Sequence, residues 1–140
     1  MRILSVDDSA VIRKFIRSGV EAMQFEMVEA CDGKAALHLL AEQGAAIDLI
    51  LLDWNMPEMD GLEFLHAIKS CPSFRHIPVM MVTTESEREN MIQAVQAGAI
   101  NYLIKPFTLE ELTQKIEECV ACCVEQKVYS ENLDSSKGLS

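Results

Sequence analysis

The sequence is poor in positive charge and contains no long apolar run. Twelve lysines and arginines stand against 22 aspartates and glutamates, which gives a net charge of −10. Such an acidic chain is poorly suited to bind nucleic acid, because phosphates attract basic surfaces. No hydrophobic segment approaches the ~20 residues of a membrane-spanning helix, and no signal-peptide core follows Arg2. We therefore expect a cytoplasmic protein that neither inserts into a membrane nor binds nucleic acid directly.

Cysteine occurs in an odd number and without the spacing of a disulfide-rich secreted protein. We interpret the five cysteines as reduced thiols. Cys119, Cys122 and Cys123 share a face of one predicted helix, but no histidine stands at a matching metal-ligand spacing, which favours packing roles. Internal repeats and low-complexity blocks are also lacking. At 140 residues, 49% of them hydrophobic, the chain fits one domain with one buried core.

One stretch, residues 48–61, combines a buried strand with a turn. Residues 49–52 are all apolar and do not alternate with polar ones, which is typical of a strand covered on both faces in a parallel sheet. The run ends at Asp53, and the turn pairs Met56-Pro57 and Asp60-Gly61 follow. Asp53 is therefore predicted to lie where a strand meets a loop, the place where open α/β sheets bind ligands.

Apolar runs alternate with amphipathic stretches along the rest of the chain. Strands are predicted at residues 3–6, 25–30, 49–52, 77–82 and 102–104. A helix is predicted after each strand, with starts at Ser9, Asp32, Gly61, Ser86 and the capping-box pair Thr108 and Glu111. Five strand–helix units indicate an α/β protein with a doubly wound, five-stranded parallel sheet and five helices on its two faces.

Two predicted helices have broad apolar stripes that we expect to face the sheet. In the first helix the stripe consists of Val11, Ile12, Phe15, Ile16 and Val20. In the fourth helix it consists of Met91, Ile92 and Val95, and Gly98 is expected to end that helix.

The side chains able to do chemistry stand at the ends of predicted strands. They are Asp7 and Asp8 after the first strand, Asp53 after the third, Thr83 after the fourth and Lys105 after the fifth. If these four strands are neighbours, the five side chains converge on one rim of the sheet. A lone aspartate at a strand end is more often a helix cap or turn former, so it is the convergence that favours a functional interpretation.

Three carboxylates in so small a space repel one another and call for a cation. Mg²⁺ suits them, because it binds carboxylate oxygens and retains several waters. An ammonium group and a hydroxyl beside the ion suit phosphoryl oxygens, and an aspartate can accept phosphate as an acyl phosphate. The residues alone therefore predict Mg²⁺-dependent phosphoryl transfer to Asp53, with Lys105 and Thr83 holding the transferred oxygens.

Five motifs, in their order and spacing, resemble one known family. They are Val6-Asp7-Asp8-Ser9, Asp53-Trp54-Asn55-Met56-Pro57-Glu58-Met59-Asp60-Gly61, Met81-Val82-Thr83, Gly98-Ala99 and Lys105-Pro106-Phe107. Together they make residues 1–124 similar to the receiver domain of bacterial two-component response regulators, in particular to its single-domain chemotaxis members. The polar residues 125–140 lie outside the resemblance, and we expect a tail or a linker stub there.

The resemblance implies a flavodoxin-like sheet with strand order 2-1-3-4-5 and a metal site at its rim. It makes Asp53 the phosphoacceptor. It also implies that Mg²⁺, or Mn²⁺ in its place, binds Asp8, Asp53 and the backbone carbonyl of Asn55, with Asp7 acting through water.

Further roles follow from the resemblance alone. The phosphoryl group is expected to contact Lys105, Thr83 and Thr84. The switch between two states is expected to involve Thr83 and Tyr102, and the rate of dephosphorylation to depend on Asn55 and Glu85. The peptide bond between Lys105 and Pro106 is expected to be cis.

The resemblance also implies partners. The phosphoryl donor is expected to be a phosphohistidine on a histidine kinase or a histidine phosphotransfer protein. An output protein or a second copy of the chain is expected to bind the fourth helix, fifth strand and fifth helix, at a surface that includes Glu87, Arg88, Met91, Tyr102 and Lys115. Thr84 and Glu87 replace a smaller and a basic residue of the chemotaxis members. Arg13, Lys14 and Arg17 form either a solvated face or a docking site for the donor.

Two other classes of protein share parts of this pattern. A Mg²⁺-dependent phosphatase of the haloacid dehalogenase type also uses an aspartate nucleophile at a strand end. It usually has Asp-x-Asp where this chain has Asp53-Trp54-Asn55, and its cap domain does not fit the length. A pseudo-receiver would have a broken acid set, whereas this set is complete. We therefore expect a signalling protein that catalyses only its own phosphorylation and dephosphorylation.

Overall fold

The computed structural model describes residues 1–122, except for the side chains of Glu85 and Arg88. The strands are β1 (Arg2–Val6), β2 (Glu26–Ala30), β3 (Leu49–Asp53), β4 (Val79–Thr84) and β5 (Asn101–Lys105). The α-helices are α1 (Ala10–Ala22), α2 (Gly33–Gln43), α3 (Gly61–Ser70), α4 (Met91–Gln96) and a last helix described over 109–122. The 3₁₀ helices η1 (Gly44–Ala46) and η2 (Glu85–Asn90) precede β3 and α4. Cys123 and the predicted tail at 125–140 lie outside the described residues.

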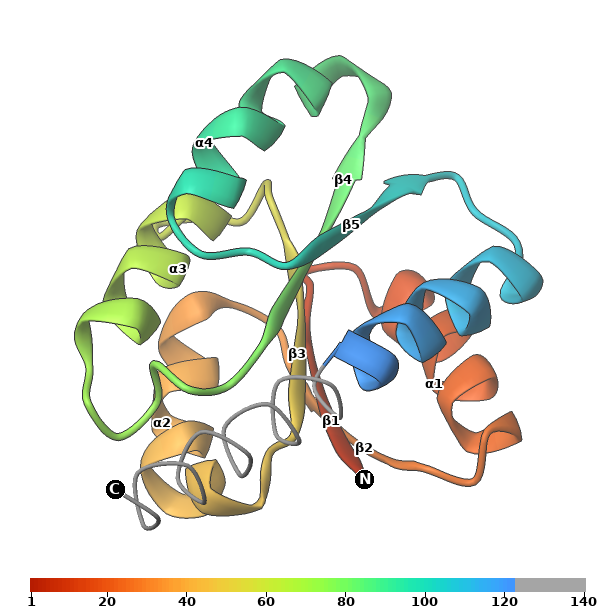
Figure 1. Cartoon of the computed structure of the whole chain (residues 1–140), viewed down its shortest axis with the longest axis horizontal. Coiled ribbons are helices and arrows are strands. Elements are labelled where there is room, and N and C mark those ends of the chain that lie inside the picture. The colour runs from red at the N-terminus through yellow and green to blue at the C-terminus, as the bar shows by residue number, and fades with distance from the viewer. Residues whose placement is uncertain (123–140) are drawn as a thin grey trace, which may run out of the picture.

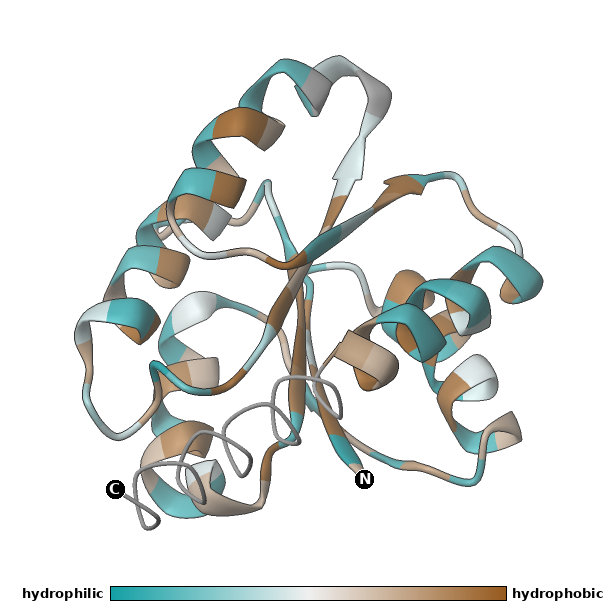
Figure 2. Cartoon of the chain, in the orientation of Figure 1, coloured by the Kyte–Doolittle hydropathy of each residue, from teal (hydrophilic) through white to brown (hydrophobic). Residues whose placement is uncertain are grey.

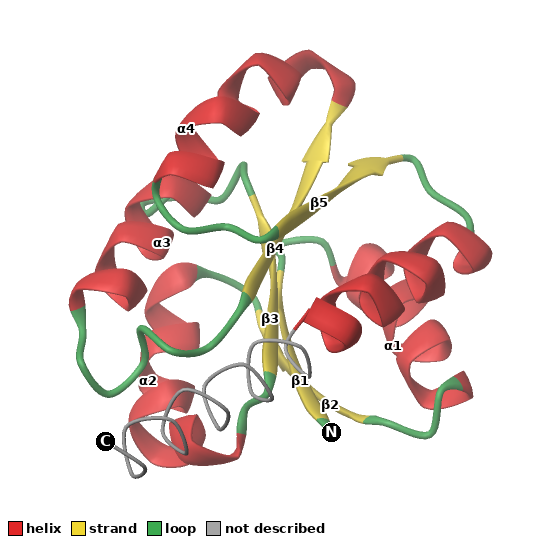
Figure 3. Cartoon of the chain, in the orientation of Figure 1, coloured by secondary structure: helices red, strands yellow, loops and turns green. Residues whose placement is uncertain are grey.

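The five strands form one parallel sheet in the order β2-β1-β3-β4-β5, which confirms the predicted fold (Figure 3). The register pairs Val6 with Leu52, Asp53 with Val82, and Thr84 with Lys105. The carboxyl ends of β1, β3, β4 and β5 therefore meet along one edge. The strand order runs in opposite directions from β1 and from β3, so the connections leave these two neighbours toward opposite edges of the sheet. A crevice is therefore expected at the carboxyl ends of β1 and β3.

Helices cover both faces of the sheet and enclose two hydrophobic cores. Figure 1 shows α1 and helix 109–122 on one side and α2, α3 and α4 on the other. All five residues of β3 are buried, as its unbroken apolar run predicted. Figure 2 shows hydrophobic residues on the strands, whereas hydrophobic and hydrophilic residues alternate along the helices. Within residues 1–122, no helix combines the length and the apolar character that crossing a membrane requires.

The predicted helix starts are confirmed at four positions, where a side chain satisfies a free backbone N–H group. Ser9 accepts from the N–H of Ile12, Asp32 from Ala35, and Asp60 from Glu63. Thr108 accepts from the N–H of Glu111 at 3.0 Å, which is the Thr108 half of the predicted capping box, and the Glu111 carboxylate accepts from the Thr108 hydroxyl at 3.3 Å.

The predicted apolar stripe of α1 is too broad. The side chains that face the sheet are Ile16 and Val20, with Ile12 partly buried, whereas Val11 is 77% and Phe15 37% exposed. Val11 and Phe15 each precede an inward residue by one position, which turns them about 100° away from the sheet.

The predicted start of the fourth helix is also wrong. Residues 85–90 form the 3₁₀ helix η2, and Ser86 shares a 2.8 Å hydrogen bond with the Thr84 hydroxyl instead of capping α4. With roughly three residues per turn, η2 changes the phase of the segment. Met91 and Ala94 face the core, whereas Ile92 and Val95 are 69% and 59% exposed. Gly98 ends the helix as predicted, with a φ of +113° that side chains rarely tolerate.

Candidate functional site

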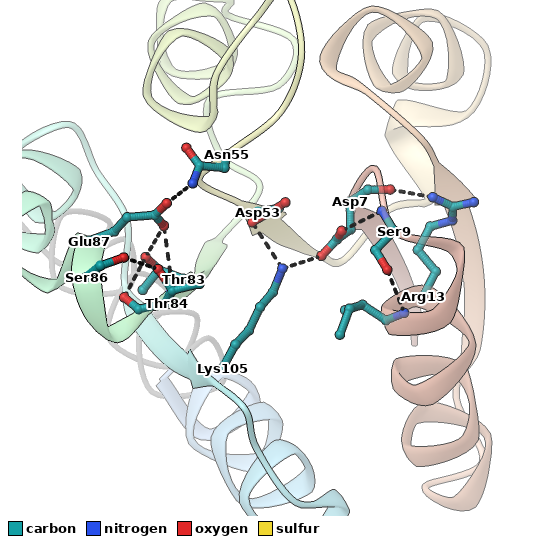
Figure 4. Close-up of polar contacts among 11 residues, drawn as sticks. Asp7, Ser9, Arg13, Asp53, Asn55, Thr83, Thr84, Ser86, Glu87 and Lys105 are labelled. Carbon is teal, nitrogen blue, oxygen red and sulfur yellow. Dashed lines mark hydrogen bonds and ion pairs between the residues drawn. The ribbon is translucent and has the colours of Figure 1, made fainter.

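The strand-end side chains come together at the carboxyl edge of the sheet, as predicted (Figure 4). Asp53 is the last residue of β3 and Lys105 the last of β5, while Asp7 and Asp8 directly follow β1. Thr83 precedes the last residue of β4. The parallel register puts these positions along one edge, so residues far apart in the sequence share a single site.

Lys105 joins two of the carboxylates. Its Nζ donates to Asp7 Oδ2 at 3.0 Å and to Asp53 Oδ1 at 3.2 Å, and both aspartate side chains are buried. Burial by itself lowers the pKa of Lys105, but the hydrogen bond to Asp7 and the charges of both aspartates outweigh it and raise the pKa. Lys105 is therefore a fixed cation at the rim. The Lys105–Pro106 peptide bond is cis, as the resemblance implied.

Asp53 is difficult to ionise in this setting. Its side chain is removed from solvent, and burial followed by the nearby Asp7 charge raises its pKa to about 6, against the opposing effect of Lys105. A carboxylate must be ionised to act as a nucleophile. Additional positive charge at the rim would therefore favour the ionised form of Asp53.

The three rim aspartates fit a divalent cation. Ligand oxygens of Asp7, Asp8 and Asp53 all lie within 4.8 Å of one another, and Asp8 is exposed. Two buried carboxylates and one open to solvent suit Mg²⁺, which binds a few carboxylates and retains water. Asp7 also accepts the N–H of Ser9 at 2.8 Å, which fixes its orientation. The role implied for the Asn55 carbonyl stays a prediction.

The turn after β3 requires glycine at position 61. A Cβ there would lie 2.5 Å from the Asp53 carbonyl oxygen and 2.9 Å from Trp54 Cα, both backbone atoms. The Gly61 N–H donates to the Trp54 carbonyl at 2.8 Å and closes the loop. The start of α3 thus lies directly against Asp53, which holds the acidic residue at the rim.

Thr83 and Thr84 form hydrogen bonds with the carboxylate of Glu87, a residue that was predicted to lie on the output surface. The Thr83 hydroxyl donates to Glu87 Oε2 at 2.8 Å, and the Thr84 N–H points to the same oxygen at 3.4 Å. The Asn55 side-chain amide donates to Glu87 Oε1. Figure 4 shows these groups on the η2 side of the rim, with Lys105 between Asp53 and Asp7.

Comparison with known proteins decides the family. The family model for the response regulator receiver domain matches residues 3–117. The chain belongs to the response regulator receiver domain family. Chemotaxis protein CheY of Pseudomonas aeruginosa is 40% identical over 119 residues, which are 84% of this chain and 94% of that protein. Chemotaxis protein CheY-3 of Vibrio cholerae is 38% identical, over 84% of this chain and 90% of its own length.

Solved structures agree with this assignment. Chemotaxis protein CheY4 of Vibrio cholerae superposes with a TM-score of 0.76 at 34% identity, covering 84% of this chain and 96% of that one. NtrX from Brucella abortus gives a TM-score of 0.86 at 26% identity, and the match covers 93% of this chain but 29% of the longer NtrX chain. This chain is thus a two-component signalling receiver domain of CheY type.

The surface predicted for output is partly wrong. Glu87 is only 9% exposed and faces the rim, and Met91 belongs to the core, so neither contributes to an exposed receiver surface. Tyr102 is partly buried, and the Lys115 ammonium lies 5.2 Å from the centre of its ring. The side chain of Arg88 lies outside the described residues.

Arg13 also differs from the expected solvated face. It donates to the Asp7 carbonyl and pairs with Glu29 at 3.2 Å, with little exposed surface. Arg17 pairs with the same Glu29 at 2.6 Å, and this hydrogen bond raises its pKa. These two positive charges are thus largely matched by acidic neighbours, and Arg13 supports the start of the rim loop.

Glu87 was not identified as a site residue because its signal in the sequence is weak. It lies in a polar segment, residues 85–90, where an acid is normally solvated. Only its position four residues after the strand-end threonine places it near the free N–H and hydroxyl donors of that strand end. The Glu85 side chain is not described, so its predicted role stays a prediction.

Proposed function

We propose that this receiver domain is a cytoplasmic response regulator whose Asp53 accepts a phosphoryl group from a phosphohistidine on a histidine kinase or phosphotransfer protein. The observation that carries the proposal is the Lys105 bridge between Asp7 and Asp53 at the carboxyl edge of the sheet. This bridge brings together a buried acceptor, Asp53, a second acid, Asp7, and a fixed cation, Lys105. The chain would then be a switch that catalyses only the phosphorylation and dephosphorylation of its own aspartate.

The transfer would proceed at Asp53 Oδ. A carboxylate oxygen attacks phosphorus, an O–P bond forms as the N–P bond of the phosphohistidine breaks, and the imidazole nitrogen keeps the electron pair and takes up a proton. Mg²⁺, when bound by the acids, would neutralise charge on the carboxylates and on the phosphoryl oxygens. Lys105 already lies within hydrogen-bond distance of Asp53, so its ammonium is placed to hold a phosphoryl oxygen. Attack of water on phosphorus reverses the modification and releases inorganic phosphate.

The output would follow from movement of Thr83 toward the new phosphoryl oxygens. Space vacated by Thr83 would admit Tyr102, which lies on the neighbouring strand β5 and packs against the hydrophobic core. The two states would have Tyr102 turned inward or outward. Phosphorylation would favour one of them, because the phosphoryl group can bind Thr83 in only that state. The affected surface is α4, β5 and helix 109–122, where exposed Ile92 and Val95 suit an output protein or a second copy of the chain.

Acetyl phosphate with Mg²⁺ or Mn²⁺ tests the proposal without a cognate kinase. Wild type should gain the mass of one phosphoryl group, whereas Asp53→Asn and a chelated sample should gain none. Turnover of a simple phosphomonoester would instead favour the phosphatase alternative. Equal labelling of Asp53→Asn and wild type would overturn the proposal.

A further inference from the structure

Glu87 is a buried carboxylate held by three neutral donors. Its side chain accepts from the Thr83 hydroxyl at 2.8 Å, from the Thr84 N–H at 3.4 Å and from the amide of Asn55. These donors come from β4 and from the turn after β3, while Glu87 itself belongs to η2. Figure 4 shows the carboxylate drawn in between them on the side of the rim opposite Asp7. Donors that converge in this way also form the kind of site that binds an anion.

The donors that hold Glu87 are the ones that a phosphoryl group on Asp53 is expected to need. A hydroxyl has a single proton to donate, and a backbone amide likewise. Thr83 cannot donate to Glu87 and to a phosphoryl oxygen at once, and the same holds for Thr84 N–H. The carboxylate and the phosphoryl group are also both negative, so they repel each other in a poorly solvated site.

We propose that Glu87 is an internal competitor for the phosphoryl pocket, bound to its donors in the unphosphorylated receiver and displaced when Asp53 is phosphorylated. This inference rests on the proposed function. Displacement would free Thr83 for the phosphoryl oxygens. It would also move η2, which leads directly into α4 and carries Glu87. The same exchange would therefore oppose phosphorylation and transmit it to the output surface.

The test is the affinity for beryllium fluoride, a phosphoryl mimic, titrated in the presence of Mg²⁺. Trp54, the only tryptophan, directly follows Asp53 and provides the fluorescence signal. Glu87→Gln keeps the shape of the side chain and removes the charge, so it should bind the mimic about tenfold more tightly than wild type. Glu89→Gln is the matched control, because Glu89 is an exposed acid in the same 3₁₀ helix, and it should bind like wild type.

A second comparison separates competition from a general effect on folding. In a Thr83→Val background the contested hydroxyl is absent, so the gain from Glu87→Gln should shrink clearly. If Glu87→Gln proves unstable in urea, Glu87→Ala replaces it in both arms, with the same expected gain.

Each outcome decides a different claim. If wild type binds the mimic in a way that needs Mg²⁺ and Asp53, but neither Glu87 variant binds it more tightly, the competitor role of Glu87 is overturned. The proposed function would still stand. An equal gain in Glu89→Gln would also overturn it, because charge anywhere on η2 would then suffice. Failure of every variant to bind the mimic would overturn both claims.

Discussion

When no cation is bound, the ionised Asp53 carboxyl lowers the free energy of unfolding. Its pKa is raised to about 6 from 3.8, by burial first and by Asp7 second. Below about pH 4 both folded and unfolded chains keep the proton, and no cost arises. Between about 4 and 6 the unfolded chain loses the proton first, so the free energy of unfolding falls as pH rises.

This predicts that Asp53→Asn is more stable than wild type at pH 7 in a chelator, by on the order of 2–3 kcal/mol. The difference should vanish toward pH 4, because protonated Asp53 is then neutral like asparagine. Urea unfolding at several pH values measures it. Adding Mg²⁺ should reduce the difference by stabilising folded wild type. A difference that is absent at pH 7, or that grows as pH falls, would contradict this account of the site.

The turn from β3 into α3 is fixed by the lack of a side chain at Gly61. Gly61→Ala would push a Cβ against the backbone of Asp53 and Trp54, so we expect a loss of about 1–3 kcal/mol in the free energy of unfolding. Gly33→Ala is a matched control, because the three atoms nearest to its Cβ would all belong to the Met59 side chain and not to the backbone. Urea denaturation of the two variants should show the larger loss for Gly61→Ala. Equal losses would show that backbone contact at position 61 does not set the turn.

Segments with a strong local pattern were predictable, and those shaped by distant contacts were not. The unbroken apolar run before Asp53 predicted a strand buried on both faces. Because strand ends in a parallel sheet share an edge, the predicted site correctly placed Asp7, Asp53 and Lys105 together. The α4 segment failed because η2 adopts three residues per turn, which apolar spacing does not reveal. The burial of Glu87 depends on donors from β4 and from the turn after β3, and its position four residues after Thr83 is only a weak sign of it in the sequence.

Signal transmission across the domain depends on Thr83 in this account. Thr83→Ala should still be phosphorylated at Asp53, yet it should lose most of the change in partner affinity or self-association. The expected coupling is on the order of 1–3 kcal/mol, which the alanine cannot support because it has no hydroxyl to offer. Titrating a partner, or following self-association, with and without beryllium fluoride measures the coupling in both proteins. Equal gains in wild type and Thr83→Ala would exclude Thr83 as the carrier of the signal.

The central claim is that the phosphoryl group resides on the Asp53 carboxylate. The most direct measurement treats the phosphorylated protein with borohydride, which reduces an acyl phosphate to an alcohol, and locates the change by peptide mass mapping. We expect one reduced position, residue 53, and none in a chelated or unphosphorylated sample. A phosphoryl group that resists borohydride and maps to a serine, threonine or histidine would contradict it.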